Sequence, residues 1–207
     1  ATISDSQATG TITNDDAALA LSSLDGNNGF KLQGVALDDY TGWGTEGLDG
    51  GDINGDGFAD MIVGVYYADP GAINKAGSTY VVFGSGSAFS SNTNLSSLDG
   101  TNGFRLDGID SDDQSGVSVA NAGDVNGDGI DDIIIGARLA DPNGSSSGES
   151  YVVFGKSSGF AASLDLSTLN GTNGFRIDGS TAGESSGRSV SSAGDVNGDG
   201  FSDLLIG

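Results

Sequence analysis

Three nine-residue segments of the chain combine residue types and spacing that could bind a metal ion. They cover residues 52–60, 124–132 and 195–203, and each reads Asp-x-Asn-Gly-Asp-Gly-x-x-Asp, where x is any residue. We call these segments the first, second and third acidic loops. Their first residues lie 72 and 71 residues apart. A fixed spacing of this length indicates a repeat architecture.

Alternate positions of each acidic loop supply oxygen ligands. Positions 1, 3, 5 and 9 carry side-chain oxygens, position 7 offers its backbone carbonyl, and glycines at positions 4 and 6 let the loop curl tightly. About six to eight oxygens in a flexible loop suit Ca²⁺, whereas Mg²⁺ requires a stricter octahedron. We therefore expect three calcium sites that are structural rather than catalytic. The predicted metal ligands are Asp52, Asn54, Asp56, Phe58 and Asp60 in the first loop, Asp124, Asn126, Asp128, Ile130 and Asp132 in the second, and Asp195, Asn197, Asp199, Phe201 and Asp203 in the third.

The acidic loops begin like an EF-hand but end differently. An EF-hand carries a bidentate Glu at its twelfth position and is flanked by helices. The twelfth positions here are Val63, Ile135 and Ile206, all within apolar segments. We expect the ninth-position aspartate to complete the site and the loop to join two strands. A metal-free Asp/Asn/Gly turn is the alternative, because such turns are common in hairpins. Three copies that keep every ligand position favour the cation.

The composition of the chain argues against several classes of function. Seven Lys and Arg residues against 29 Asp and Glu residues leave a net charge of −22, which repels nucleic acids and anionic membranes. Without His or Cys, the chain cannot form a Ser–His–Asp triad, a Cys–His pair or a zinc motif. A pair of carboxylates could still do acid–base chemistry, but we expect no enzyme. No apolar run is long enough for membrane insertion.

Other segments recur in a constant order around the acidic loops. The segment Leu24–Gly34 returns at Leu98–Gly108 and Leu169–Gly179, and Tyr80–Gly84 returns at Tyr151–Gly155. A strongly apolar segment follows each loop, as in Ile133-Ile134-Ile135. A strand with one wet face would alternate between apolar and polar residues, so we expect these segments to be strands buried on both faces.

These patterns predict an all-β fold of repeated four-stranded antiparallel blades, as in a β-propeller. Each period holds four short strand candidates separated by turns, and no segment has a helical period. Blades covered on both sides by their neighbours are what a propeller requires; a β-sandwich and a β-solenoid are the alternatives. We expect blades at about 42–108 and 116–179 and a partial blade at 187–207, within a repeat region of 21–207. The propeller would then be incomplete or assembled: the chain continues, copies assemble, or the repeats stack openly.

The recurring motifs resemble FG-GAP repeats, the blades of integrin α-subunit propellers and of many bacterial surface proteins. The resemblance is carried by Phe83-Gly84, Phe154-Gly155, Ile135-Gly136-Ala137 and the acidic loops, and covers roughly residues 20–207. The Gly-Ala-Pro element is interrupted, since Arg138 follows Ala137. Residues 42–48 of the first blade stand where the family has an apolar first strand, so we expect that strand to be irregular.

Residues 1–20 differ from the rest of the chain. They contain two short stretches rich in Thr and Ile, of which residues 10–16 resemble the closing strand of Calx-beta domains. A β-prone linker is an equal alternative. A third possibility is a strand that pairs with another copy of the protein.

Strand order predicts a second functional surface. If each acidic loop joins the first and second strands at one face, the loops 35–41, 65–79, 109–115, 137–149 and 180–186 lie at the opposite face. They hold Tyr40, Tyr66, Tyr67 and several aspartates. In FG-GAP propellers ligands usually dock away from the calcium loops, so the resemblance implies a protein or carbohydrate ligand there. Ordinary solvated loops are the alternative.

The leading functional hypothesis is a calcium-stabilised binding or adhesion module of a large bacterial surface or secreted protein. Calcium affinity in the weak range of extracellular modules implies an extracellular or cell-surface location. One alternative is a structural subunit of an extracellular fibre, self-associated by strand exchange through residues 1–20. Another is the accessory propeller of a hydrolase. The sequons at Asn94, Asn143 and Asn170 allow glycosylation in a suitable host.

Overall fold

A computed structural model describes residues 21–42, 50–157 and 159–207 of the chain. Residues 1–20, with the Calx-beta-like stretch and the proposed exchanged strand, lie outside the described residues. So does nearly all of the first strand expected at 42–48.

The described residues form an all-β fold, as predicted. The strands are β1 (Lys31–Gln33), β2 (Met61–Val65), β3 (Ser78–Val82), β4 (Asn92–Asn94), β5 (Gly103–Asp107), β6 (Ser118–Gly123), β7 (Asp132–Ala137), β8 (Glu149–Val153), β9 (Ser163–Asp165), β10 (Gly174–Asp178), β11 (Val190–Gly194) and β12 (Asp203–Ile206). Four short 3₁₀ turns accompany them: η1 (Leu21–Ser23), η2 (Pro70–Ala72), η3 (Leu95–Ser97) and η4 (Leu166–Thr168). No helix within the described ranges is long and apolar enough to reach across a bilayer.

One complete four-stranded blade lies in the second half of the chain. Its strand order is β6-β7-β8-β10 and all three pairings are antiparallel. We call this sheet the second blade. It confirms the predicted antiparallel unit, and the second acidic loop connects β6 to β7.

The first blade contains β2, β3 and β5 in antiparallel order, and a fourth strand comes from the following repeat. This strand, β9, pairs in parallel with the outer edge of β5. The pair β4 and β1 repeats the arrangement one repeat earlier. The sequence did not predict β4 or β9. Each repeat therefore lends a short strand to the repeat that precedes it.

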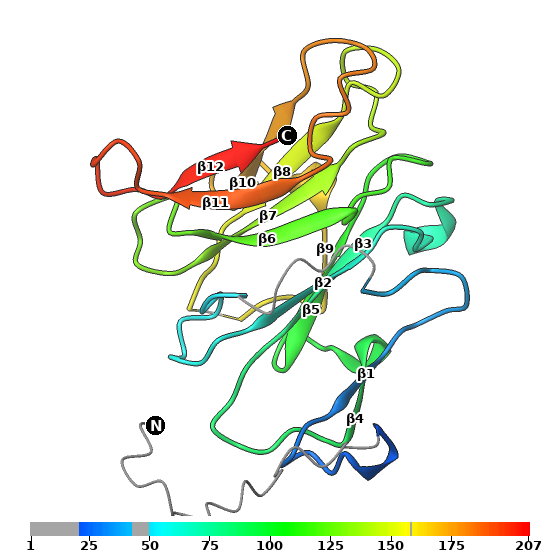
Figure 1. Cartoon of the computed structure of the whole chain (residues 1–207), viewed down its shortest axis with the longest axis vertical. Coiled ribbons are helices and arrows are strands. Elements are labelled where there is room, and N and C mark those ends of the chain that lie inside the picture. The colour runs from blue at the N-terminus through cyan, green and yellow to red at the C-terminus, as the bar shows by residue number, and fades with distance from the viewer. Residues whose placement is uncertain (1–20, 43–49, 158) are drawn as a thin grey trace, which may run out of the picture.

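A third unit follows the second blade. It consists of β11 and β12, joined by the third acidic loop. Figure 1 shows the sheets stacked in sequence, with β11 and β12 beside β6. The described residues form no closed ring of blades, and the blade boundaries given above remain predictions.

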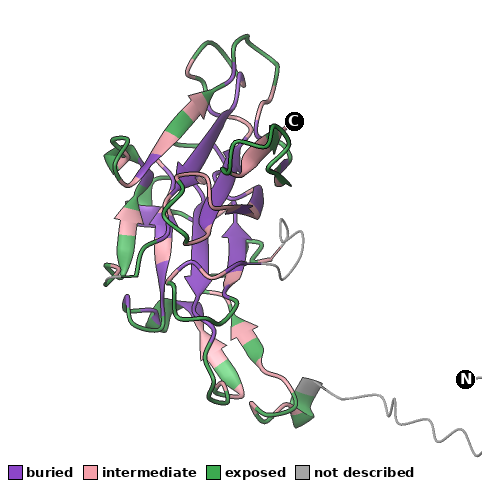
Figure 2. Ribbon diagram, turned by 90° about the vertical axis from the view of Figure 1, so that its left-hand side faces the viewer, coloured by how far each residue is buried: buried purple, intermediate pink, exposed green. Residues whose placement is uncertain are grey.

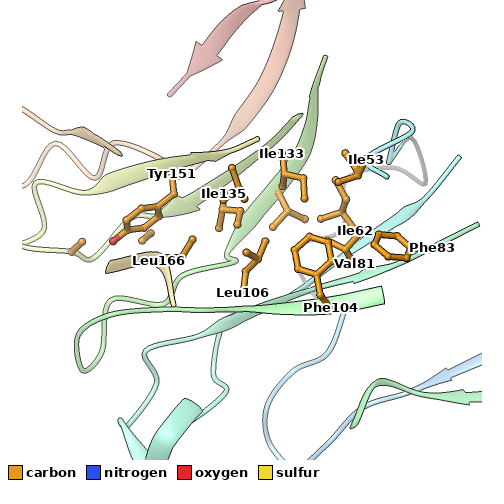
Figure 3. Packing of buried hydrophobic residues seen from close by; sticks show 14 residues of the cluster. Ile53, Ile62, Val81, Phe83, Phe104, Leu106, Ile133, Ile135, Tyr151 and Leu166 are labelled. Carbon is orange, nitrogen blue, oxygen red and sulfur yellow. The ribbon is translucent and has the colours of Figure 1, made fainter. Parts of the chain in front are cut away.

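The main core lies between the first and second blades. Ile62, Val81 and Phe104 of the first blade meet Ile133 and Ile135 of the second, as Figure 3 shows. On the other face of β7, Ile134 packs against the third unit in a separate cluster with Val190. All six residues of β7 are buried, so alternate side chains enter two different cores. This confirms the predicted burial on both faces, visible as the purple central strands of Figure 2.

Glycines in the buried strands allow the blades to approach closely. A Cβ atom added at Gly136 would lie only 1.9 Å from the carbonyl oxygen of Gly187, which lies just before β11 of the third unit. The equivalent Gly64 faces the carbonyl oxygen of Gly116 at 2.1 Å. No real Cβ atom fits at such distances, so these positions require glycine for packing.

Candidate metal centre

The acidic loops lie at one end of the strands that they connect. In Figure 1 the loops between β6 and β7 and between β11 and β12 both lie on the left of the molecule. The second and third acidic loops thus join two antiparallel strands, as predicted, and the first leads directly into β2.

The aspartate at position 1 organises each loop. In the first loop, Oδ1 of Asp52 accepts the N–H of Asp56 at 2.9 Å and Oδ2 accepts the N–H of Gly57 at 2.8 Å. Asp124 and Asp195 accept the corresponding N–H groups of their own loops. Gly57 has a φ of 89°, a left-handed conformation that favours glycine. The first aspartate therefore fixes the curl of the loop.

Positions 3 and 5 face each other across the turn. In the first loop, Oδ1 of Asn54 accepts the N–H of Asp56 at 2.9 Å, and Nδ2 of Asn54 donates to Oδ2 of Asp56 at 2.9 Å. The second loop repeats both bonds, at 2.8 and 3.1 Å. In the third loop, Nδ2 of Asn197 donates instead to Asp203, at 3.4 Å.

The aspartate at position 9 joins the loop to the Phe-Gly pair. Asp132 is fully buried; its Oδ2 accepts the N–H of Val125 and its Oδ1 accepts the N–H of Gly155, both at 2.9 Å. Asp60 makes the same two bonds, to Ile53 at 2.9 Å and to Gly84 at 2.8 Å. The sequence predicted a metal ligand here and missed this structural role. The available signal was the recurrence of Phe-Gly after the first two loops, with the glycine 24 residues after Asp60 and 23 residues after Asp132.

Within the described ranges, no Lys or Arg side chain forms an ion pair with a carboxylate of the acidic loops. Burial raises the pKa of Asp60 and Asp132 to about 6, backbone N–H groups oppose the rise, and the neighbouring loop aspartates add to it. Ion pairs among the described residues join Arg105 to Asp107 and Arg176 to Glu149 and Asp178, all outside the loops. A bound cation would supply the missing positive charge.

The donor atoms in the loops suit a hard cation, but the described geometry does not by itself form a metal site. Among the described residues, no three carboxylates gather at metal-ligand spacing. The loop oxygens instead accept backbone N–H groups. Each carboxylate oxygen has a second lone pair, and in the described chain no hydrogen bond ends on the carbonyl oxygens of Phe58, Ile130 or Phe201. An all-oxygen set with these open acceptors fits Ca²⁺ chemistry, and the ligand assignments remain predictions.

The loops expected at the opposite face do lie at the other ends of the strands. The segment 137–149 joins β7 to β8 there, and its Ser145 and Ser146 accept backbone N–H groups from the 180–186 loop. Tyr66 and Tyr67 lie 4.5 Å apart between ring centroids, with Tyr40 5.1 Å from Tyr67. A hollow of about 370 Å³ between the 109–115 and 137–149 loops is lined mainly by carboxylates. Its charged lining residues are Asp110, Asp113, Asp141, Glu149, Asp178 and Arg176.

The FG-GAP repeat family matches the chain in three segments, residues 45–82, 115–153 and 186–207. The chain carries FG-GAP repeats. Each matched segment contains one acidic loop and the apolar strand that follows it. The acidic loops and Ile135-Gly136-Ala137 lie inside the matched segments, and the Phe-Gly pairs at 83–84 and 154–155 follow directly after two of them. The all-β blades fit this family.

Integrin α chains are similar to this protein. Over 179 aligned residues the chain is 28% identical to integrin alpha-4 of Xenopus laevis. The alignment covers 86% of this chain and 15% of that protein. It is 30% identical over 157 residues to human integrin alpha-7, covering 75% of this chain and 11% of that protein. The chain thus spans less than a sixth of the length of these curated relatives.

Proposed function

We propose that this chain is a calcium-stabilised β-propeller-type module for binding or adhesion, working outside the cell as part of a large bacterial surface or secreted protein. The observation that carries the proposal is the same acidic loop in each of three FG-GAP repeats, with oxygen donors only and no basic partner among the described residues. Similarity to integrin α chains supports a binding role.

Each calcium ion would be held by positions 1, 3, 5, 7 and 9 of one acidic loop. The ion would offset the repulsion between carboxylates and hold the strand connection in place. Because it binds only the folded loop, each site would add about 2.7 kcal/mol to the free energy of unfolding at a free calcium concentration of about 100 times the dissociation constant.

The ligand surface of this module would be the face opposite the acidic loops. The clustered tyrosines provide rigid amphipathic contact area of the kind enriched in interfaces, and the carboxylate-lined hollow gives the face a strong negative charge. A protein or carbohydrate ligand fits this surface. The absence of His and Cys from the sequence supports a binding role over an enzymatic one.

The test is a comparison of melting temperatures with millimolar Ca²⁺, millimolar Mg²⁺ and EDTA. Calcium should raise the melting temperature and EDTA should lower it, with magnesium much less effective. A triple variant, Asp56→Asn, Asp128→Asn and Asp199→Asn, should lose the calcium response. Melting curves that do not change with chelation would refute the proposed role of calcium.

A fibre subunit is a second candidate, favoured by one observation. The strands β4 and β9 already add in parallel to the sheet of the preceding repeat, so sheets of this chain accept a strand from elsewhere. Light scattering on the chain with and without residues 1–20 separates the candidates. Large assemblies that disappear on truncation support the fibre, and a monomer in both forms supports the binding module.

A further inference from the structure

Neighbouring acidic loops are hydrogen-bonded to each other. The N–H of Asp131, at position 8 of the second loop, donates to the carbonyl oxygen of Asp52 at 3.3 Å. The N–H of Ser202, at position 8 of the third loop, donates to the carbonyl oxygen of Asp124 at 2.8 Å. Position 8 of one loop thus holds position 1 of the preceding loop at both junctions.

The first junction carries an additional contact. Oδ2 of Asp131 accepts the N–H of Asp52 at 2.9 Å, so both backbone groups of Asp52 are bound to the second loop. One repeat unit further on, position 8 is Ser202, which has no carboxylate. The first junction therefore has a side-chain hydrogen bond in addition to the backbone bond that both junctions share.

The side chains at position 7 pack over the preceding loop. A Cβ atom at Gly55, position 4 of the first loop, would lie 3.4 Å from Cδ1 of Ile130. At Gly127 of the second loop it would lie 2.4 Å from Cε1 of Phe201. Both contacts place position 7 of one loop on the curled part of the loop before it.

The N–H that bonds to the preceding loop and the carbonyl predicted to bind calcium belong to the same peptide unit. The carbonyl of Ile130 is a predicted calcium ligand, and the N–H of the same planar peptide is that of Asp131, which binds Asp52. A cation on the carbonyl orients the whole unit and strengthens the hydrogen bond from its N–H. The peptide between Phe201 and Ser202 has the same position relative to Asp124.

We propose that the three acidic loops form a coupled array in which calcium binding at one loop raises the affinity of the loop before it, with Asp131 as the positioning residue of the first junction. The inference rests on the proposed calcium function. The physical basis is that an ion in the second loop fixes the peptide and carboxylate that hold Asp52, so the first loop has less disorder to lose when its own ion binds.

Titration of calcium into the calcium-free full chain, by calorimetry and by competition with a chromophoric chelator, tests the coupling. The unmodified chain should bind with a Hill coefficient above one. Asp128→Asn, which disables the second loop, should weaken binding at the first loop by about fivefold or more. Asp199→Asn is the matched control: it disables the third loop, which in the described chain shares no hydrogen bond with the first, and it should leave first-loop affinity nearly unchanged.

Substitutions at position 8 separate geometry from charge. Asp131→Ser introduces the residue found at this position in the third loop and removes the acceptor for the Asp52 N–H. It should lower the Hill coefficient but leave it above one, because the backbone hydrogen bonds at both junctions remain. Asp131→Asn keeps an acceptor oxygen without the charge and should retain cooperativity. Ala59→Ser, at the same position of the first loop, is the control for folding.

Two results would overturn the inference while leaving the proposed function intact. One is calcium binding with a Hill coefficient of one in the unmodified chain. The other is equal first-loop affinity in the Asp128→Asn and Asp199→Asn variants. Failure to bind calcium at millimolar concentration is a different result, and it would overturn the proposed function together with the coupling.

Discussion

Gly155 is the position where the structure makes its sharpest prediction, because it links the Phe-Gly pair to the second acidic loop. A Cβ atom there would lie 2.2 Å from the carbonyl oxygen of Asp131 and 2.8 Å from that of Ile53. Neither atom belongs to a movable side chain, so Gly155→Ala must push the turn away from the loop. That shift breaks the 2.9 Å hydrogen bond from Gly155 to the buried carboxylate of Asp132.

Two costs set the size of the effect. Overpacking a tight contact costs about 1–3 kcal/mol, and a buried oxygen left without its donor costs about 1–3 kcal/mol. We expect Gly155→Ala to lower the free energy of unfolding by about 2–6 kcal/mol in total. In a chain of this size each 1 kcal/mol corresponds to about 2–4 °C, so the melting temperature should fall by about 4–24 °C.

Thermal and urea unfolding in millimolar calcium measure this loss. Gly159→Ala is the matched control, since a Cβ atom at Gly159 would meet no atom within 4 Å; its effect should stay within about 1 kcal/mol. If the two variants unfold alike, the Phe-Gly pair does not support the acidic loop in the way described above.

The core and the acidic hollow give two further predictions. Ile134→Ala removes a fully buried side chain and should cost about 2–5 kcal/mol in urea unfolding, whereas Leu205→Ala, at a residue that is 64% exposed, should change stability by less than about 1 kcal/mol. Burial, then repulsion from Asp110, Glu149 and Asp141, raises the pKa of Asp113 from 3.8 to about 6. The folded state therefore binds the proton more tightly, and this contribution to stability is complete below about pH 4 and is lost as the pH rises through about 6. Asp113→Asn should stabilise the chain by about 2–3 kcal/mol near pH 7.5 and reduce the change in its stability between about pH 4 and 6, while Asp60 and Asp132 still contribute to that change. A variant with unchanged pH dependence would show that Asp113 is not the group responsible.

The sequence predicted the features that depend on side-chain pattern. The unbroken run Ile133-Ile134-Ile135 indicated a strand buried on both faces, and β7 has that environment because a blade packs on each side of it. Recurrence of the motifs likewise indicated antiparallel blades. These inferences succeed because burial and repetition leave a direct record in residue types.

The strands β4 and β9 could not be predicted from a pattern of residue types. Ser163-Leu164-Asp165 is three residues long, too short to show a period, and its polar ends resemble a turn. Its partner is β5 of the preceding repeat, so the strand exists only through a contact that is distant along the chain. Tertiary packing, rather than local preference, decides such a segment.

The position-9 aspartates show a second limit. The residue type alone identified Asp60 in the first loop and Asp132 in the second as possible oxygen ligands. Which partner the oxygens face depends on where the N–H groups of Gly84 and Gly155 lie, and the fold of the next turn sets that. Spacing within a loop cannot reveal this partner.

Because β9 joins the sheet of the preceding repeat, the first blade cannot be completed until the next repeat has been synthesised. The first blade is synthesised up to residue 107, yet the outer edge of β5 has its partner only after residues 163–165 leave the ribosome. Until then an unpaired edge strand is open to pairing with other chains. The ion pair of Arg105 with Asp107 lies on this strand, and charged side chains on an edge discourage such pairing. Arg105 and Asp107 of β5 would thus protect the nascent chain from pairing with other chains until β9 is synthesised.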